Sequence, residues 1–190
     1  MTIRDPAPLN DLDALRAAVA AGQPLEYLFF WGHRARSEGE QGPWLLSQWW
    51  PCRFEVDGDA YASAEHFMMA EKARLFGDDA MRAEILAAPS PDKAKNLGRK
   101  VRGFDEARWH DTRFEIVCRG SVAKFESDAA LRGYLLGTAN KVLVEASPYD
   151  RVWGIGMGAK DERARDPRTW QGLNLLGFAL MHARATLRAR

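Results

Sequence analysis

The sequence predicts one compact, mainly α-helical domain of the α+β class, in which a few short strands accompany many helices. Segments of helical composition recur along the chain, and several begin at Ser or Asp and end at Gly. The apolar runs between them are short, which is typical of buried strands. The 190 residues contain no internal repeat, low-complexity tract or linker, and 46% of them are hydrophobic, which argues against disorder.

The predicted helices are distributed over the whole chain. Ser63 is a suitable N-cap for the second of them, and Gly77 ends it. Ser90 precedes Pro91, which favours a helix that begins with proline at its first position. The helical segments are residues 11–21, 63–76, 78–87, 90–97, 105–124, 128–136 and 174–188.

Two apolar runs, residues 27–31 and 142–144, predict buried strands. Residues 54–61 predict a hairpin that turns at Asp57-Gly58. Residues 32–43 and 159–168 are expected to form surface loops. We expect residues 1–24 to form an N-terminal extension with one helix, and residues 25–190 to form the main domain.

Charge and cysteine usage limit the function classes. The 27 basic and 26 acidic residues give a net charge of +1, which does not favour sequence-independent binding to duplex nucleic acid or to an anionic membrane. Residues 1–15 lack an apolar segment typical of a signal peptide, and no run approaches the ~18 apolar residues of a spanning helix. Cys52 and Cys118 fit no paired motif and are interpreted as reduced thiols, so we expect a cytoplasmic protein.

Metal and nucleotide motifs are weak. The four histidines form no HExxH or HxxxH pattern, so the sequence predicts neither a metal site nor a cofactor. Residues 154–158 are rich in glycine, but they lack the GxGxxG order of a Rossmann loop and the Lys-Ser/Thr of a P-loop.

One stripe of the helix predicted at 63–76 carries functional groups. Glu65, Met69 and Lys72 follow i, i+4, i+7 spacing and therefore share a face. The carboxylate and the amine lie about 10 Å apart along the axis, too far for a good ion pair but suitable for holding one ligand from two sides. The alternatives are a first-turn glutamate favoured by the helix dipole and a solvated lysine.

The glycine-rich segment predicts a ligand-binding loop. Asp150 offers a carboxylate for ribose hydroxyls, Arg151 a cation for phosphate, and Trp153 a ring for stacking. Backbone N–H groups of Gly154 and Gly156 are candidates for cradling an anion. A tight turn beside a core tryptophan explains the same residues equally well.

Several motifs in this order resemble the NADAR family, also called YbiA-like. Ser63-x-Glu65-His66-Phe67 leads to Glu71-Lys72-Ala73, and Trp109 and Lys124-Phe125 follow. The stretch 147–156, SPYDRVWGIG, closes the series, and its residues 150–156 are the most specific segment. The likeness spans about residues 27–188, so residues 25–190 are identified as the family domain. One departure is Gln48-Trp49, where the family usually has Asn-Phe, and a ligand contact there would shift.

The resemblance implies an N-glycosidase that acts on a phosphorylated ribose. Family substrates are ribosylaminopyrimidine phosphates of riboflavin synthesis and ADP-ribosylated guanine in nucleic acid. The implied catalytic residues are Glu65, which stabilises an oxocarbenium-like centre or activates water, Lys72, which binds the sugar or forms an imine, and Asp150, which holds ribose hydroxyls. The implied substrate-binding residues are Ser47, Gln48, Trp109, Lys124, Arg151, Trp153, Gly154 and Gly156.

The rival expectation is a non-catalytic ADP-ribose or NAD-binding module. It would need the aromatic and glycine residues but not the acid, so the presence of Glu65, Lys72 and Asp150 favours the enzyme. The expected partners are a ribosyl phosphate or ADP-ribose substrate and ADP-ribosylated nucleic acid, which the basic cluster at residues 99–102 would steer toward the pocket.

Overall fold

The computed structural model describes residues 9–35, 37 and 39–190. The part of the predicted N-terminal extension that covers residues 1–8 therefore lies outside the described residues. The helices are α1 (Leu12–Ala20), α2 (Ala64–Leu75), α3 (Asp79–Leu86), α4 (Pro91–Gly98), α5 (Glu106–Glu126), α6 (Ala129–Gly137) and α7 (Leu175–Arg188). The strands are β1 (Tyr27–Phe30), β2 (Phe54–Val56), β3 (Asp59–Tyr61) and β4 (Val142–Glu145). The predicted fold class is confirmed.

The helix starts follow the predicted capping residues. The Ser63 hydroxyl accepts a hydrogen bond from the His66 N–H at the start of α2. Ser90 caps α4 in the same way, with Pro91 at its first position. These side chains satisfy N–H groups that a helix leaves unpaired, which is why the starts could be located from sequence.

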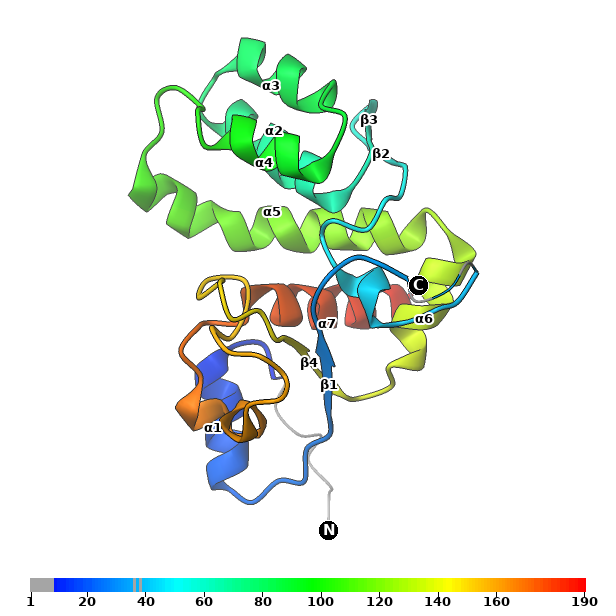
Figure 1. The fold of residues 1–190 in the computed structure, drawn as a ribbon, viewed down its shortest axis with the longest axis vertical. Helices are drawn as coiled ribbons and strands as arrows, with labels where there is room; N and C mark the ends of the chain where they lie inside the picture. Colours follow the sequence, from blue (N-terminus) through cyan, green and yellow to red (C-terminus); the bar gives the residue numbers. More distant parts are fainter. Residues whose placement is uncertain (1–8, 36, 38) are drawn as a thin grey trace.

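The helices are arranged around a central pair. In Figure 1, α5 and α7 run side by side across the middle of the molecule, with α2, α3 and α4 on one side and β1, β4 and α1 on the other. One apolar core fills the space between α2, α5 and α7. A second core contains Leu15 of α1 together with Val142, Val144, Ile155 and Trp170. The N-terminal helix thus packs against the loop that follows β4.

The two sheets are small. β2 and β3 form the predicted hairpin. β1 and β4 pair in parallel, with Phe30 opposite Glu145. Because the carboxyl ends of parallel strands meet at one edge, residue 31 and the residues after 145 lie close together.

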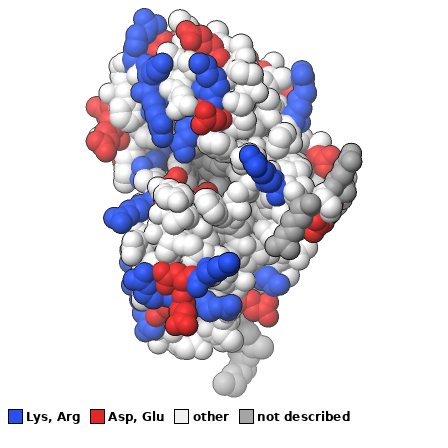
Figure 2. Space-filling model, in the orientation of Figure 1, with Lys and Arg blue, Asp and Glu red and all other residues white. Residues whose placement is uncertain are grey.

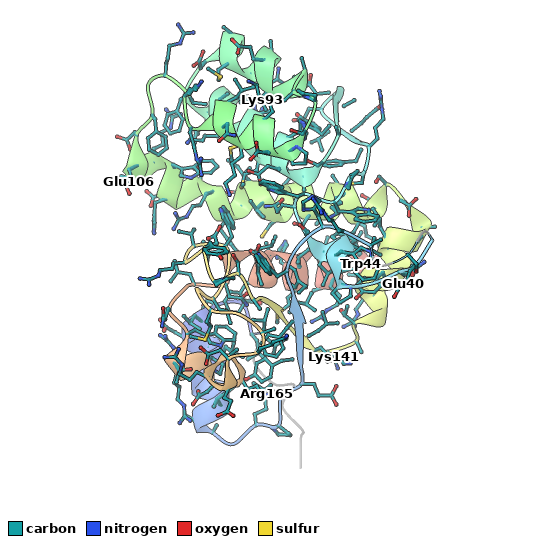
Figure 3. The ribbon with its side chains drawn as sticks, in the orientation of Figure 1. Glu40, Trp44, Lys93, Glu106, Lys141 and Arg165 are labelled. Carbon is teal, nitrogen blue, oxygen red and sulfur yellow. The ribbon has the colours of Figure 1, made fainter. Side chains whose placement is uncertain are left out.

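The structure corrects two local predictions and adds one element that was not predicted. β1 ends at Phe30, and Trp31 is 59% exposed rather than part of a buried strand. The predicted loop at 159–168 contains a 3-10 helix at Glu162–Arg165, and another follows at Pro167–Thr169. Residues Pro43–Leu46 form a further 3-10 helix, and its Trp44 is buried beside β1 and α6 (Figure 3).

Within residues 9–35, 37 and 39–190, no helix has the length and apolar character needed to cross a membrane.

Candidate active site

A cavity of about 450 Å³ lies where α2, α4 and α5 face the loop after β4. Figure 2 shows it as a hollow near the middle of one face, with Lys and Arg side chains along its upper rim and acidic atoms inside. The functional residues lining it come from far apart in the sequence. They are Glu65 and Lys72 of α2, Lys95 of α4 and Arg99 directly after it, Trp109 and Arg113 of α5, Glu145 of β4, and Tyr149, Asp150, Arg151 and Trp153 of the following loop.

The predicted stripe of α2 forms one wall of this cavity. Glu65, Met69 and Lys72 all line it, as their helical spacing indicated. The α2 start is fixed on both sides, because the Glu65 N–H donates to the Gln48 carbonyl and His66 Nε2 lies 3.0 Å from the Ala88 carbonyl oxygen. The carboxylate of Glu65 is therefore held on a rigid backbone.

Glu65 is a buried acid with incomplete hydrogen bonding. The residue is 3% exposed, and the Trp49 indole N–H donates to its Oε2 over 3.2 Å. Its Oε1 is buried and has no hydrogen-bond partner among the described residues. Burial raises the pKa of Glu65 to about 7, against the opposing effects of Lys95 and of the Trp49 hydrogen bond.

A second acid, Glu145, was missed by the sequence interpretation. Its Oε2 is also buried without a hydrogen-bond partner in the described part of the chain. Burial raises its pKa to about 8, and the nearby carboxylates of Asp150 and Glu65 add to the rise. An acid directly after the buried run 142–144, at the end of a strand, was the signal that could have identified it.

Asn174 fixes the backbone around Glu145, which lines the pocket. Asn174 has a left-handed backbone with φ of +55°, and its side-chain oxygen accepts from the Glu145 N–H at 2.9 Å. Its side-chain nitrogen donates to the Leu143 carbonyl at 2.9 Å, and its own N–H donates to the Gly154 carbonyl. One residue thus joins β4, the glycine-rich loop and the start of α7.

Lys72 occupies the opposite end of the α2 stripe, beside aromatic rings. Its ammonium donates to the Gly98 carbonyl at 2.9 Å. It lies 4.1 Å from the centroid of the Phe104 ring and 5.6 Å from that of Trp109. Burial lowers the pKa of Lys72, which makes its amine more available as a nucleophile.

Asp150 shapes the loop that forms the facing wall. Its Oδ1 accepts from the N–H groups of Val152 and Trp153 at 2.8 and 2.7 Å. These bonds hold Trp153 in the pocket lining, across from Trp109 of α5. Arg151 also lines the pocket, so the structure brings together the aspartate, the cation and the two tryptophans that the sequence singled out.

Neither glycine of the predicted phosphate cradle is among the residues that line the pocket. The Gly156 N–H donates to the Asp150 carbonyl at 3.0 Å and is therefore occupied within the loop. A Cβ on the buried Gly154 would lie 2.8 Å from the Glu145 carbonyl oxygen. The prediction that Gly156 donates to phosphate is wrong, and both glycines are needed instead for close backbone packing.

Lys124 differs from its predicted role as a substrate contact. It is 1% exposed, and its ammonium donates to the carbonyls of Leu45 and Ser47, each at 2.7 Å. Burial lowers its pKa to about 8. The lysine therefore positions the segment whose Ser47 and Gln48 line the pocket, rather than reaching the pocket itself.

Three further cations in the lining were not among the predicted site residues, although Arg99 belongs to the predicted basic cluster at residues 99–102. Lys95 and Arg99 come from α4 and the residue after it, and Arg113 comes from α5. The Lys95 ammonium lies 5.7 Å from the centroid of the Trp49 ring. With Lys72 and Arg151, five cations surround the three carboxylates of the pocket. This composition suits an anionic ligand that meets acidic groups at its reacting end.

The chain is similar to several known proteins. Residues 29–188 match the family model described as the NADAR domain. The chain is 40% identical over 164 residues to N-glycosidase R617 of Acanthamoeba polyphaga mimivirus, covering 84% of this chain and 95% of that protein. Over 144 residues it is 35% identical to the chloroplastic riboflavin biosynthesis protein PYRR of Zea mays, covering 70% of this chain but only 21% of that protein.

A third relative also has a solved structure. N-glycosidase YbiA of Escherichia coli (strain K12) is 34% identical over 138 residues, which covers 73% of this chain and 76% of that protein. The NMR structure of E. coli YbiA superposes with a TM-score of 0.67 at 27% identity and covers 86% of each chain.

Proposed function

The chain belongs to the NADAR family, and from this premise we propose that it is an N-glycosidase that hydrolyses the C1′–N bond of a phosphorylated ribosyl or ADP-ribosyl substrate. Supporting relatives carry the name N-glycosidase, and one is named for riboflavin biosynthesis. The observation that carries the proposal is the pair of buried carboxyl groups, Glu65 and Glu145, in a pocket surrounded by cations.

The surroundings of the two acids give them different protonation states. The Trp49 hydrogen bond and Arg99 favour the ionised form of Glu65, while Lys95 and Asp150 act on both acids. The Glu65 carboxylate disfavours a second negative charge beside it, so Glu145 keeps its proton to higher pH. Two acids whose pKa values are separated by their environment can serve as carboxylate and proton donor in one site.

These states match the needs of C1′–N cleavage. The C1′–N bond breaks, its electron pair passes to the base nitrogen, and that nitrogen takes the proton of Glu145. The Glu65 carboxylate stabilises the positive charge that develops at C1′. Water then bonds to C1′ and gives a proton to Glu65, and exchange with solvent restores both carboxyl groups.

Other side chains hold the substrate in this reaction. Lys95, Arg99 and Arg151 bind the phosphate in place of the glycine N–H groups. Trp109 and Trp153 stack against the base or the sugar, and Asp150 accepts from ribose hydroxyls. Substrates of this proposal are ribosylaminopyrimidine phosphates and ADP-ribosylated guanine.

The test measures the release of free base from each of the two substrates, and mass spectrometry detects the base. Glu65→Gln is expected to lower turnover by about 10²–10⁴-fold, because the amide cannot provide the charge. Glu84→Gln, an exposed change on α3, is the matched control. Near-normal turnover of Glu65→Gln would remove Glu65 from the mechanism. Binding of ADP-ribose without release of base from either substrate by the unaltered protein would instead favour the non-catalytic binding module.

In an alternative to direct attack by water, the neutral amine of Lys72 is proposed to bond to C1′ as the base leaves. The C1′–O4′ bond then breaks, O4′ takes a proton from the amine, and the resulting imine is hydrolysed by water to free the sugar and Lys72. Its lowered pKa supports this role, whereas its hydrogen bond to Gly98 also fits a lysine that only binds the sugar. Borohydride added during turnover reduces an imine to a stable amine, so a covalent adduct is expected that Lys72→Ala abolishes. An adduct on Lys95 would contradict the assignment.

A further inference from the structure

A second hollow, of about 460 Å³, adjoins the active-site pocket at the carboxyl end of β1. Its lining includes Trp31, His33, Arg34 and Trp44. Two pairs of rings connect it to the pocket, because Tyr149 and Trp49 line the pocket itself. The Trp31 and Tyr149 centroids are 6.2 Å apart, and those of His33 and Trp49 are 5.5 Å apart. Aromatic side chains therefore form the divide between the two hollows.

The Trp31–Tyr149 pair is unusually exposed. Trp31 is 59% exposed and Tyr149 is 87% exposed, and they are among the few large apolar side chains that the described residues leave in solvent. Single exposed apolar residues are common on protein surfaces. Two aromatic rings in contact with each other at the mouth of a pocket offer a surface that a ligand can cover with a gain in free energy.

The backbone fixes both rings at this place. β1 and β4 are paired in parallel with Phe30 opposite Glu145, and the Ala146 N–H donates to the Phe30 carbonyl at 2.9 Å. Trp31 directly follows β1, and Tyr149 lies in the turn directly after β4. The backbone of both residues thus lies at the same sheet edge as the acid Glu145.

The chemistry around the pair favours a nucleobase. Arg151 in the pocket and the exposed Arg34 in the second hollow flank the rings with positive charge. A planar base can stack on the indole or phenol face while the phosphates beside it meet the cations. An apolar partner would use the rings but not the arginines.

We infer that Trp31 and Tyr149 form a nucleobase-stacking subsite at the mouth of the catalytic pocket, between it and the second hollow. The inference rests on the proposed function, since the base is joined through phosphate to the ribose held in the pocket. The base is either the adenine of an ADP-ribosyl group or a neighbouring base of a nucleic-acid strand. Either source makes a ribosyl monophosphate an incomplete ligand, because it has no second base.

Binding measurements by calorimetry test this subsite. The probes are ADP-ribose, ribose 5-phosphate and a single-stranded oligonucleotide of about eight nucleotides. Trp31→Ala and Tyr149→Ala are each expected to weaken one of the two base-containing probes about tenfold, from the typical contribution of one stacked base. Affinity for ribose 5-phosphate is expected to stay unchanged. Trp31→Phe and Tyr149→Phe keep an aromatic ring, so these variants should retain most of the affinity for the base-containing probes.

The probes separate the source of the base. Loss confined to ADP-ribose assigns the subsite to the adenine, and loss confined to the oligonucleotide assigns it to a neighbouring base. Leu173→Ala, another exposed apolar side chain that does not line the pocket, is the control and should change neither.

Two outcomes overturn the inference. One is unchanged affinity for both base-containing probes in the alanine variants. The other is an equal loss for all three probes, which would mark a general disturbance of the pocket. Because the readout is binding, a failure of base release in the unaltered protein would contradict the proposed N-glycosidase without affecting this result.

Discussion

Lys124 of α5 and Glu65 of α2 are two charged residues with nearly the same burial, 1% and 3% exposed, and opposite hydrogen bonding. The Lys124 ammonium donates to two carbonyls, whereas Glu65 has one donor and one unpaired oxygen. A buried charge costs free energy unless polar groups compensate it. We therefore infer that Lys124, whose charge is compensated by hydrogen bonds, has a structural role. Glu65 is incompletely compensated, so we infer that its free oxygen is available to a ligand.

The two residues meet at the segment 45–49. Lys124 holds the carbonyls of Leu45 and Ser47, and the same segment provides the Gln48 carbonyl and the Trp49 indole N–H to Glu65. The structural charge thus supports the functional one. Three substitutions test this difference, in order of decreasing expected effect.

The largest effect is expected from Lys124→Met. It leaves the Leu45 carbonyl without its Lys124 donor and the Ser47 carbonyl with only the Trp50 N–H, so the free energy of unfolding should fall by about 2–4 kcal/mol. Denaturant unfolding followed by fluorescence measures this change. Lys160→Met, on the surface, is the control. Unchanged stability combined with weaker ADP-ribose binding would place Lys124 in the pocket after all.

A smaller effect of opposite sign is expected from Glu65→Gln. Folding raises the pKa of Glu65 from 4.5 to about 7, so ionisation opposes folding as the pH rises through this range. The variant should therefore be more stable than the unaltered protein by about 1–3 kcal/mol at about pH 8 and nearly equal at about pH 4. Unfolding curves at both pH values give the comparison. A loss of stability at the higher pH would mean that the carboxylate is fully compensated.

The smallest effect is expected from Asp150→Asn. The amide oxygen can keep accepting from Val152 and Trp153, so stability should change by less than about 1 kcal/mol. Its lost charge no longer raises the pKa of Glu65 or Glu145.

The pH profile of kcat/KM detects that change. Activity should fall below about pH 7 as Glu65 gains a proton and above about pH 8 as Glu145 loses one. In Asp150→Asn both limbs should move to lower pH by less than one unit. Limbs that stay in place would show that other groups control the profile.

The sequence was informative where the physics is local. A helix of period 3.6 with a serine cap places Glu65, Met69 and Lys72 on one face whatever surrounds it, and all three line the pocket. The capped helix starts and the hairpin at 54–61 were predictable for the same reason.

Non-local partners could not be predicted in this way. Lys124 is held by a carbonyl 79 positions away, and nothing in its own segment indicates that partner. Lys95 reaches the pocket only because α4 packs against α2. Glycine content indicated a loop but not that the Gly156 N–H would be used inside it. Trp31 leaves the predicted buried run because β1 ends before it and Gly32 turns the chain with φ of +81°.

The three hydrogen bonds of Asn174 have a consequence for altering this protein by design. They fix the backbone around Glu145, because they join β4, the glycine-rich loop and the start of α7. The side chains of Trp31 and Tyr149 are exposed at the mouth of the pocket and take no part in these hydrogen bonds. A library randomised at those two positions can therefore search for new glycosides while the bond-breaking groups keep their places.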